Sequence, residues 1–197
     1  MTENRQTPAA RKPRADAERN RLRLLEVAKS AFADKGAGVS LEEIARAAGV
    51  GIGTLYRHFP TRDALIIEVY RNESEQLFRA AERLALSLPP VEALRAWMLL
   101  FTDYIATKHG MYAALNSLVG GTSELYADTG ARTRKAIELL TDRAVASGEI
   151  HLDMDPLDLL RAVAGIANVS AGPDWKRAAQ RLVDILIAGL QARAPQH

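Results

Sequence analysis

Residues 39–59, VSLEEIARAAGVGIGTLYRHF, carry the local signals that decide the fold. Ser40 and Glu43 have the spacing of a capping box, in which the serine side chain accepts a hydrogen bond from the Glu43 backbone and the glutamate side chain accepts one from the Ser40 backbone. Val39 and Ile44 stand where a hydrophobic staple belongs. A helix is therefore predicted to begin at Ser40.

This helix is predicted to run only to about Ala48, because Gly49 readily adopts the left-handed conformation that ends a helix. A second short helix is predicted over residues 51–58, before a proline breaks the chain. Two short helices that cross at a steep angle need a small residue at the crossing and a glycine in the turn, and Ala45 and Gly49 supply them. The stretch therefore predicts a helix-turn-helix at about residues 40–59.

The rest of the chain has the apolar period of amphipathic helices, with steps of three and four residues. No sustained alternation of apolar and polar residues occurs, so no strands are predicted. The predicted fold is all-α and has no internal repeat. The further helices are predicted at about residues 16–35, from Thr61 to just before Pro89, and at about 90–108, 110–119, 122–147, 156–171 and 174–193.

Composition excludes several classes of protein. The 197 residues include no cysteine, so a disulfide framework, a cysteine-ligated metal and a thiol nucleophile are all ruled out. The four histidines are scattered, and Asp155 before Pro156 is predicted to cap a helix rather than to bind metal. No metal and no other cofactor is predicted. No apolar run is long enough for a membrane span and residues 1–14 do not form a secretory signal, so a cytoplasmic location is predicted.

Charge is distributed unevenly along the chain. Residues 1–62 hold 12 Lys and Arg against 7 Asp and Glu, whereas the remainder holds 14 against 17. A basic end on a mildly acidic body is typical of a protein that meets a polyanion. Residues 1–15 are polar and basic and are predicted to form a flexible arm. This arm is either a solvated tail or a segment that follows phosphates or enters a minor groove.

Residues 24–65, LLEVAKSAFADKGAGVSLEEIARAAGVGIGTLYRHFPTRDAL, resemble the DNA-binding domain of TetR-family transcriptional regulators, with a match over about residues 19–70. The stretches MYAALNSLVGG and HLDMDPLDLLRAVAGI are similar to the SbtR-like subset of that family. The resemblance implies an all-α homodimer whose C-terminal domain binds a small molecule and dimerises. The domains expected are the arm at 1–15, a DNA-binding domain at 16–80 and an effector-binding and dimerisation domain at 81–197.

The resemblance also implies which residues face DNA. The second helix of the motif should lie in the major groove of a double-stranded operator, with its flanks against phosphates. Arg57 is either a reader of a guanine edge or a phosphate ligand, and Leu55 and Phe59 belong to the core. The predicted DNA-binding residues are Ser40, Gly51, Ile52, Gly53, Thr54, Tyr56, Arg57, His58 and Arg62.

Two residues of this set limit the contacts that the second helix can make with DNA bases. The family usually has serine at the helix N-cap where this chain has Gly51, which removes a hydroxyl group that could contact DNA. Ile52 cannot form a hydrogen bond to a base, so it either contacts a thymine methyl group or packs against sugar.

The last two predicted helices carry a broad apolar stripe, which calls for burial on two sides. The stripe is either internal core or the four-helix dimer interface that the family uses. A dimer places two copies of the recognition helix on the half-sites of a pseudo-palindromic operator, about 34 to 36 Å apart. The predicted interface residues are Leu157, Leu160, Ala164, Ala167, Leu182, Val183, Leu186 and Leu190.

Aromatic and polar-tipped side chains gather in the middle helices. Each one alone is typical of ordinary core, but as a group they predict a pocket for an apolar or aromatic small molecule. The predicted pocket residues are Trp97, Phe101, Tyr104, Met111, Tyr112, Asn116 and Tyr126.

The favoured hypothesis is a homodimeric repressor that a small-molecule ligand releases from its operator. No catalytic residues are predicted, because no nucleophile, base and orienting group stand out together. Two alternatives stay open. One is an all-α small-molecule-binding protein or enzyme with a vestigial helix-turn-helix, and the other is a DNA-binding protein without an effector.

Overall fold

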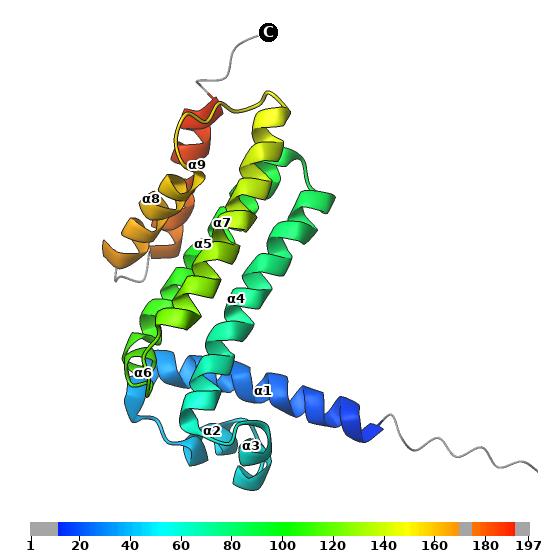
Figure 1. The fold of residues 1–197 in the computed structure, drawn as a ribbon, viewed down its shortest axis with the longest axis vertical. Helices are drawn as coiled ribbons and strands as arrows, with labels where there is room; N and C mark the ends of the chain where they lie inside the picture. Colours follow the sequence, from blue (N-terminus) through cyan, green and yellow to red (C-terminus); the bar gives the residue numbers. More distant parts are fainter. Residues whose placement is uncertain (1–11, 170–174, 192–197) are drawn as a thin grey trace, which may run out of the picture.

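The computed structural model describes residues 12–169 and 175–191, and all regular structure in these two ranges is helical (Figure 1). The all-α prediction is confirmed. The elements are α1 (Lys12–Lys35), the 3-10 turn η1 (Gly36–Gly38), α2 (Leu41–Ala47), α3 (Ile52–His58), α4 (Arg62–Ser87), α5 (Pro90–Gly110), α6 (Tyr112–Asn116), α7 (Ser123–Ala146), α8 (Pro156–Val169) and α9 (Trp175–Gln191).

The start of α1 corrects a sequence expectation. The helix was expected from about residue 16, but it begins at Lys12, so only residues 1–11 of the expected arm lie outside the described residues. Pro13 lies in the first turn, where the missing backbone N–H has no helical acceptor to lose. Alanine and arginine in the next turns favour helix, and the polar composition of this stretch therefore does not prevent it.

The capping signals of the motif form as predicted. The Ser40 side chain accepts a hydrogen bond from the Glu43 N–H at 3.1 Å, and the Glu43 carboxylate accepts one from the Ser40 N–H at 3.0 Å. Val39 and Ile44 are buried. Gly49 has a φ of +67°, the left-handed conformation that turns the chain from α2 into α3. This local geometry fixes the angle between α2 and α3.

The long helix α4 connects the two ends of the molecule (Figure 1). Its N-cap is Thr61, whose side chain accepts a hydrogen bond from the Ala64 N–H at 3.0 Å. Near its start Leu65 and Ile66 are fully buried, and towards its other end Leu77 is buried as well. The helix α1 packs against α4, and α2 and α3 pack on α1 and on each other near the start of α4 (Figure 1), while α5 and α7 run alongside α4.

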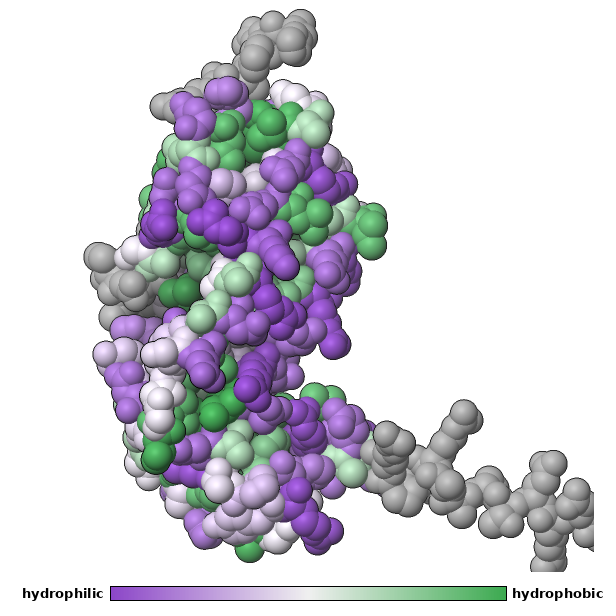
Figure 2. Space-filling model, in the orientation of Figure 1, coloured by the Kyte–Doolittle hydropathy of each residue, from purple (hydrophilic) through white to green (hydrophobic). Residues whose placement is uncertain are grey.

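The helices α8 and α9 cover α5 and α7 at the end of the molecule opposite to α3 (Figure 1). At the α3 end, α5 touches α1 closely, since a Cβ at Gly110 would lie 3.0 Å from the Ala33 Cβ. Hydrophilic residues dominate the face seen in Figure 2 along the middle of the body. Among the described helices, none combines the length and apolarity needed to cross a membrane.

Candidate functional site

The short helix α3 divides into a buried side and an open side. Leu55 and Phe59 are the buried residues, and they fasten the helix to the core. The residues on the other side contact nothing that would hide them: Tyr56 is 44% exposed and Ile52 is 36% exposed. Phe59 and Leu55 thus have the core positions that the sequence predicted for them, and the open side is free to meet a partner.

The backbone at the beginning of α3 is exposed. Gly51 is the N-cap residue and makes no side-chain cap, and a Cβ added at Gly51 or Gly53 would meet nothing within 4 Å. Thr54 is half-buried beside them. The backbone N–H groups at this end are therefore accessible, and such groups form suitable donors for phosphate oxygens.

Arg57 and His58 form the last turn of the helix. The Arg57 Nε donates a hydrogen bond to the Gly53 carbonyl at 3.2 Å, so the guanidinium lies along the exposed side of its own helix. His58 is half-buried, with its ring centroid 6.1 Å from that of Phe59. Arg57 retains four guanidinium N–H groups that could turn to a base edge or a phosphate.

Ser40 and Arg62 are held by bonds within the protein. Ser40 caps α2, and Arg62 donates hydrogen bonds to the carbonyls of Val39 and, at 2.6 Å, Ala37. The Arg62 guanidinium also lies 5.3 Å from the ring centroid of Phe32. In the structure Arg62 therefore fastens the loop before α2 to the start of α4.

The carboxylate of Glu43 belongs to this same corner. The N–H of Ser40 and the ammonium of Lys35, 3.0 Å away, together hold the pKa of Glu43 below its usual range. Because both partners favour the charged form of the carboxyl group, the hydrogen bonds of Glu43 are strongest while it is ionised.

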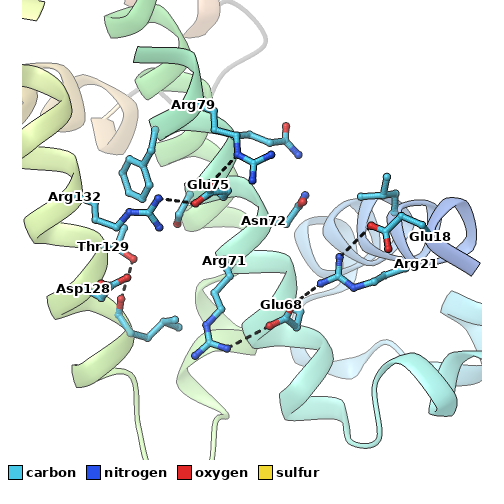
Figure 3. Close-up of a pocket in the computed structure, with 15 residues that line it drawn as sticks. Glu18, Arg21, Glu68, Arg71, Asn72, Glu75, Arg79, Asp128, Thr129 and Arg132 are labelled. Atoms are coloured by element: carbon cyan, nitrogen blue, oxygen red, sulfur yellow. Dashed lines mark hydrogen bonds and ion pairs between the residues drawn. The ribbon is translucent and has the colours of Figure 1, made fainter. Parts of the chain in front are cut away.

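A charged cleft lies between α1, α4 and α7 (Figure 3). Glu75 accepts hydrogen bonds from Arg79 at 2.7 Å and from Arg132 at 2.6 Å, and both contacts lower its pKa. Glu68 accepts in the same way from Arg21 and Arg71. The acidic and basic side chains in this cleft neutralise one another and join α4 to both of its neighbours.

A second cavity lies where α4, α5, α7 and α8 meet, and it has a different character. It is an open cavity of about 270 Å³, just below the usual range for ligand pockets. Aromatic and aliphatic side chains form most of its wall. The lining residues are Tyr70, Phe101, Tyr104, Ile105, Lys108, Tyr126, Thr129, Gly130, Thr133, Leu157, Leu160, Arg161 and Ala164.

Three of the seven predicted pocket residues, Phe101, Tyr104 and Tyr126, line this cavity. The other four lie elsewhere. Trp97 and Met111 are fully buried in the core, where the Trp97 indole donates a hydrogen bond to the Leu77 carbonyl at 2.9 Å.

Tyr112 and Asn116 are exposed on the short helix α6, and Tyr112 is 62% exposed. The aromatic composition of the middle helices pointed to the cavity, but composition does not specify how each helix is rotated.

Buried hydroxyl groups join α4 to α5 at the wall of the cavity. The Tyr104 hydroxyl donates to the Tyr70 hydroxyl at 3.0 Å and lies 3.3 Å from the Ser74 hydroxyl. Burial raises the pKa of Tyr104 well above its ordinary value, so this phenol stays neutral. Tyr70, which sequence reasoning missed, thereby connects the cavity to the helix that begins beside α3.

The residues predicted for a dimer interface fall into three environments. Leu157, Leu160 and Ala164 line the cavity, and Val183 and Leu190 are buried within the protomer.

Leu182 and Leu186 are partly exposed, and between them Ile185 is 63% exposed. The side chain of Ala167 lies outside the described residues. The apolar stripe that α9 exposes is thus narrower than the stripe predicted from the sequence.

The segment before α8 has the predicted cap. The Asp155 carboxylate accepts a hydrogen bond from the Leu157 N–H at 3.0 Å and pairs with Arg134 through two contacts of 3.1 Å. The Arg134 contact and the cap both lower the pKa of Asp155. Across residues 12–169 and 175–191, no three His, Asp or Glu side chains gather in a way that could hold a metal ion.

Comparison with known proteins matches both parts of the chain. Residues 24–69 match the family described as bacterial regulatory proteins, tetR family, and residues 89–192 match the SbtR-like C-terminal domain of transcriptional regulators. The chain belongs to the TetR family of transcriptional regulators. The resemblance noted for both stretches of the sequence is confirmed, and the helix-turn-helix is that of a DNA-binding regulator.

Solved TetR-family structures resemble the whole chain. A TetR transcriptional regulator of Streptomyces coelicolor is 45% identical with a TM-score of 0.80, covering 87% of this chain and 98% of that one. A TetR regulatory protein of Mycobacterium vanbaalenii is 34% identical with a TM-score of 0.70, covering 91% of this chain and 99% of that one.

Curated relatives match over a shorter part. A helix-turn-helix-type transcriptional regulator of Staphylococcus aureus strain USA300 is 39% identical over 61 residues, which are 30% of this chain and 33% of that protein. The chain therefore matches about a third of the length of this relative.

Proposed function

We propose that this TetR-family protein is a homodimeric repressor that releases its operator when a small molecule occupies the cavity between α4, α5, α7 and α8. The observation that carries the proposal is the shared use of α4. This helix begins at Arg62, directly after the turn that follows α3, and it contributes Tyr70 to the wall of the cavity. One element therefore begins just after the DNA-facing helix in the chain and reaches the ligand space.

Coupling through α4 has a physical basis in its contacts. The Tyr70 hydroxyl is held by Tyr104 of α5, and the Asp63 carboxylate at the start of α4 accepts a hydrogen bond from the Val119 N–H at 3.1 Å. A ligand that separates α5 and α7 from α4 changes these contacts and turns the helix. Such a ligand shifts the population of arrangements and changes the distance between the two copies of α3.

The homodimer proposal is supported by the outer face of α9. Leu182, Ile185 and Leu186 give this face an apolar stripe that the protomer leaves partly uncovered. A second copy that covers this stripe through its own α8 and α9 would form the two-fold arrangement that a palindromic operator requires.

Sedimentation velocity tests the dimer. Ile185→Glu is expected to yield monomers, because it places a charge in the middle of the stripe. Val145→Glu is the matched control, since Val145 is an exposed valine on α7 outside the stripe, and it is expected to remain dimeric. Dimers in both variants would place the interface elsewhere.

Fluorescence anisotropy tests the DNA function. The labelled probes are a duplex from upstream of the gene and an unrelated duplex of the same length, at low and moderate salt. Preferential binding of the upstream duplex that weakens steeply with salt is expected. Equal and weak binding of both duplexes would contradict sequence-specific repression of the protein's own gene.

Two exposed tyrosines provide a matched test of the contact surface. Tyr56→Ala on α3 is expected to reduce operator affinity, whereas Tyr112→Ala on α6 is expected to leave it unchanged, because Tyr112 is on a helix outside the motif. Unchanged affinity in both variants would contradict the placement of α3 in the groove.

A further inference from the structure

The cavity between α4, α5, α7 and α8 has an uneven charge. Its two charged lining residues, Lys108 and Arg161, are both basic, and no acidic side chain lines it. Arg161 is paired with Asp158 on its own helix. Lys108 makes no ion pair with any part of the chain that the structure describes. The cavity therefore has one cation without a counter-charge.

Lys108 is also partly shielded from water. Its side chain is half-buried in the last turn of α5, and this burial lowers its pKa. The ammonium group lies 4.0 Å from the ring centroid of Tyr126, a cation–π contact across the cavity wall. An aromatic face offsets only part of the cost of taking a cation out of water, so the site favours an additional negative charge.

The charged cleft between α1, α4 and α7, which shares Thr129 with the cavity, provides the contrast. There Arg21 and Arg71 share Glu68, and Arg79 and Arg132 share Glu75 (Figure 3). In that cleft each of these four cations already has a carboxylate partner within the protein. An anion arriving there would have to displace Glu68 or Glu75, whereas at Lys108 it would displace only water.

The remainder of the cavity suits an apolar body. Phe101, Leu160 and Ala164 form an apolar wall, and the Thr129 and Thr133 hydroxyls donate to carbonyls of their own helix. These hydroxyls therefore offer acceptors but no free hydrogen to a ligand. Lys108 is the side chain of the wall best placed to bind the charged end of a molecule.

We propose that the ligand of this cavity is an apolar organic anion, a carboxylate or sulfonate on an aromatic or aliphatic body, and that Lys108 binds its charged group. The proposal rests on the proposed function, in which this cavity is the effector site, and it specifies the chemical class of the effector. A neutral ligand of the same shape would leave the Lys108 ammonium without a counter-charge.

A matched pair of fluorescent probes tests the proposal on the purified full-length protein without DNA. The anion is 8-anilinonaphthalene-1-sulfonate, and the neutral probe is N-phenyl-1-naphthylamine, which has the same rings and lacks the sulfonate. Lys108→Met is expected to weaken binding of the anion by about tenfold or more, the effect of one charge-assisted hydrogen bond. Binding of the neutral probe is expected to change little.

Two further variants control this result. Lys135→Met makes the same chemical change at an exposed lysine on α7 that does not line the cavity, and it is expected to leave both probes unaffected. Ala164→Phe fills the cavity and is expected to weaken both probes. Circular dichroism of each variant checks that the fold is retained.

Three results would overturn the proposal: equal loss of both probes in Lys108→Met, no loss of the anion in that variant, or no binding of the anion to the wild-type protein. The proposed repressor function fails in a different way, by an unchanged operator affinity when the cavity is occupied. Anisotropy of the operator duplex with the bound anion measures that outcome separately.

Discussion

The α3 surface and the α4–α5–α7–α8 cavity are assembled in different ways. The α3 surface arises within about twenty consecutive residues, where Ser40 and Gly49 fix the two ends of the preceding helix. The cavity collects side chains from residues 70 to 164, and their meeting depends on how four helices pack. Local chemistry thus determines one candidate site, and tertiary packing determines the other.

The largest expected effect comes from removing the anchor of the α3 surface. Phe59 is fully buried, and Phe59→Ala is expected to destabilise the protein by about 3 to 5 kcal/mol through lost burial and a cavity. Tyr56→Ala removes a ring of similar size from the exposed side of the same helix and is expected to cost far less stability. Urea denaturation followed by circular dichroism measures both. Equal losses would mean that α3 is not fastened by its buried side.

A smaller effect is expected at the same surface when stability is left intact. Arg57→Ala removes an exposed guanidinium, and its expected cost in operator affinity is about 1 to 3 kcal/mol. Arg83→Ala, at an exposed arginine far along α4, is the control for lost positive charge. Anisotropy with the upstream duplex compares the two. An equal loss of operator affinity in the two variants would contradict a direct contact between Arg57 and DNA.

The salt dependence and sequence preference of Arg57→Ala separate its two possible roles. A phosphate ligand lost from the interface lowers the salt slope and weakens all duplexes alike, whereas a lost base contact relaxes the preference at one position.

Removal of the Ser40 cap is expected to lower the free energy of unfolding by about 1 kcal/mol. Ser40→Ala removes the acceptor of the Glu43 N–H, and caps of this kind contribute about that much. Ser87→Ala at the last residue of α4 is a control in which no N-cap is removed. Thermal unfolding of the two variants gives the difference. An unchanged stability in Ser40→Ala would show that the staple residues Val39 and Ile44 alone position α2.

The smallest effect concerns pH. The pKa of Glu43 is lowered in the folded protein, so its ionised form contributes stability above the unfolded pKa of about 4.3, and this contribution is lost as the pH falls through the folded value. Glu43→Gln is therefore expected to be less stable than the wild type at neutral pH, and the difference is expected to shrink near pH 3. Urea titrations at the two pH values measure this, and a gap of the same size in acid would contradict it.

The difference between the two regions also explains what the sequence could predict. The caps at Ser40, Thr61 and Asp155 and the turn at Gly49 follow from residue types a few positions apart, and all of them are present. Most helix bounds followed from the same signals. The exceptions were the start of α1, where a polar composition did not reveal the helix, and the helix predicted at about residues 110–119, which is the shorter α6 (Tyr112–Asn116).

Side chains that meet only after packing were harder to place. Tyr104 and Tyr112 lie eight residues apart in the same aromatic-rich stretch, yet the first is buried at the cavity and the second is exposed. Nothing in the sequence indicated that Lys108 lines the cavity, because a lysine near the end of an amphipathic helix is common. The rotation of α5 against α4 and α7 decides the positions of Tyr104 and Lys108, and the placement of α6 decides that of Tyr112; no local pattern encodes either.

The central claim is that α4 couples the α3 surface to the cavity. Hydrogen–deuterium exchange of the protein, alone and bound to the upstream duplex, tests it directly, since coupling between two sites is reciprocal. The account predicts that DNA binding changes exchange rates at residues 40–62 and also at residues 101–108 and 126–133, which line the cavity. Changes confined to residues 40–62 would contradict it.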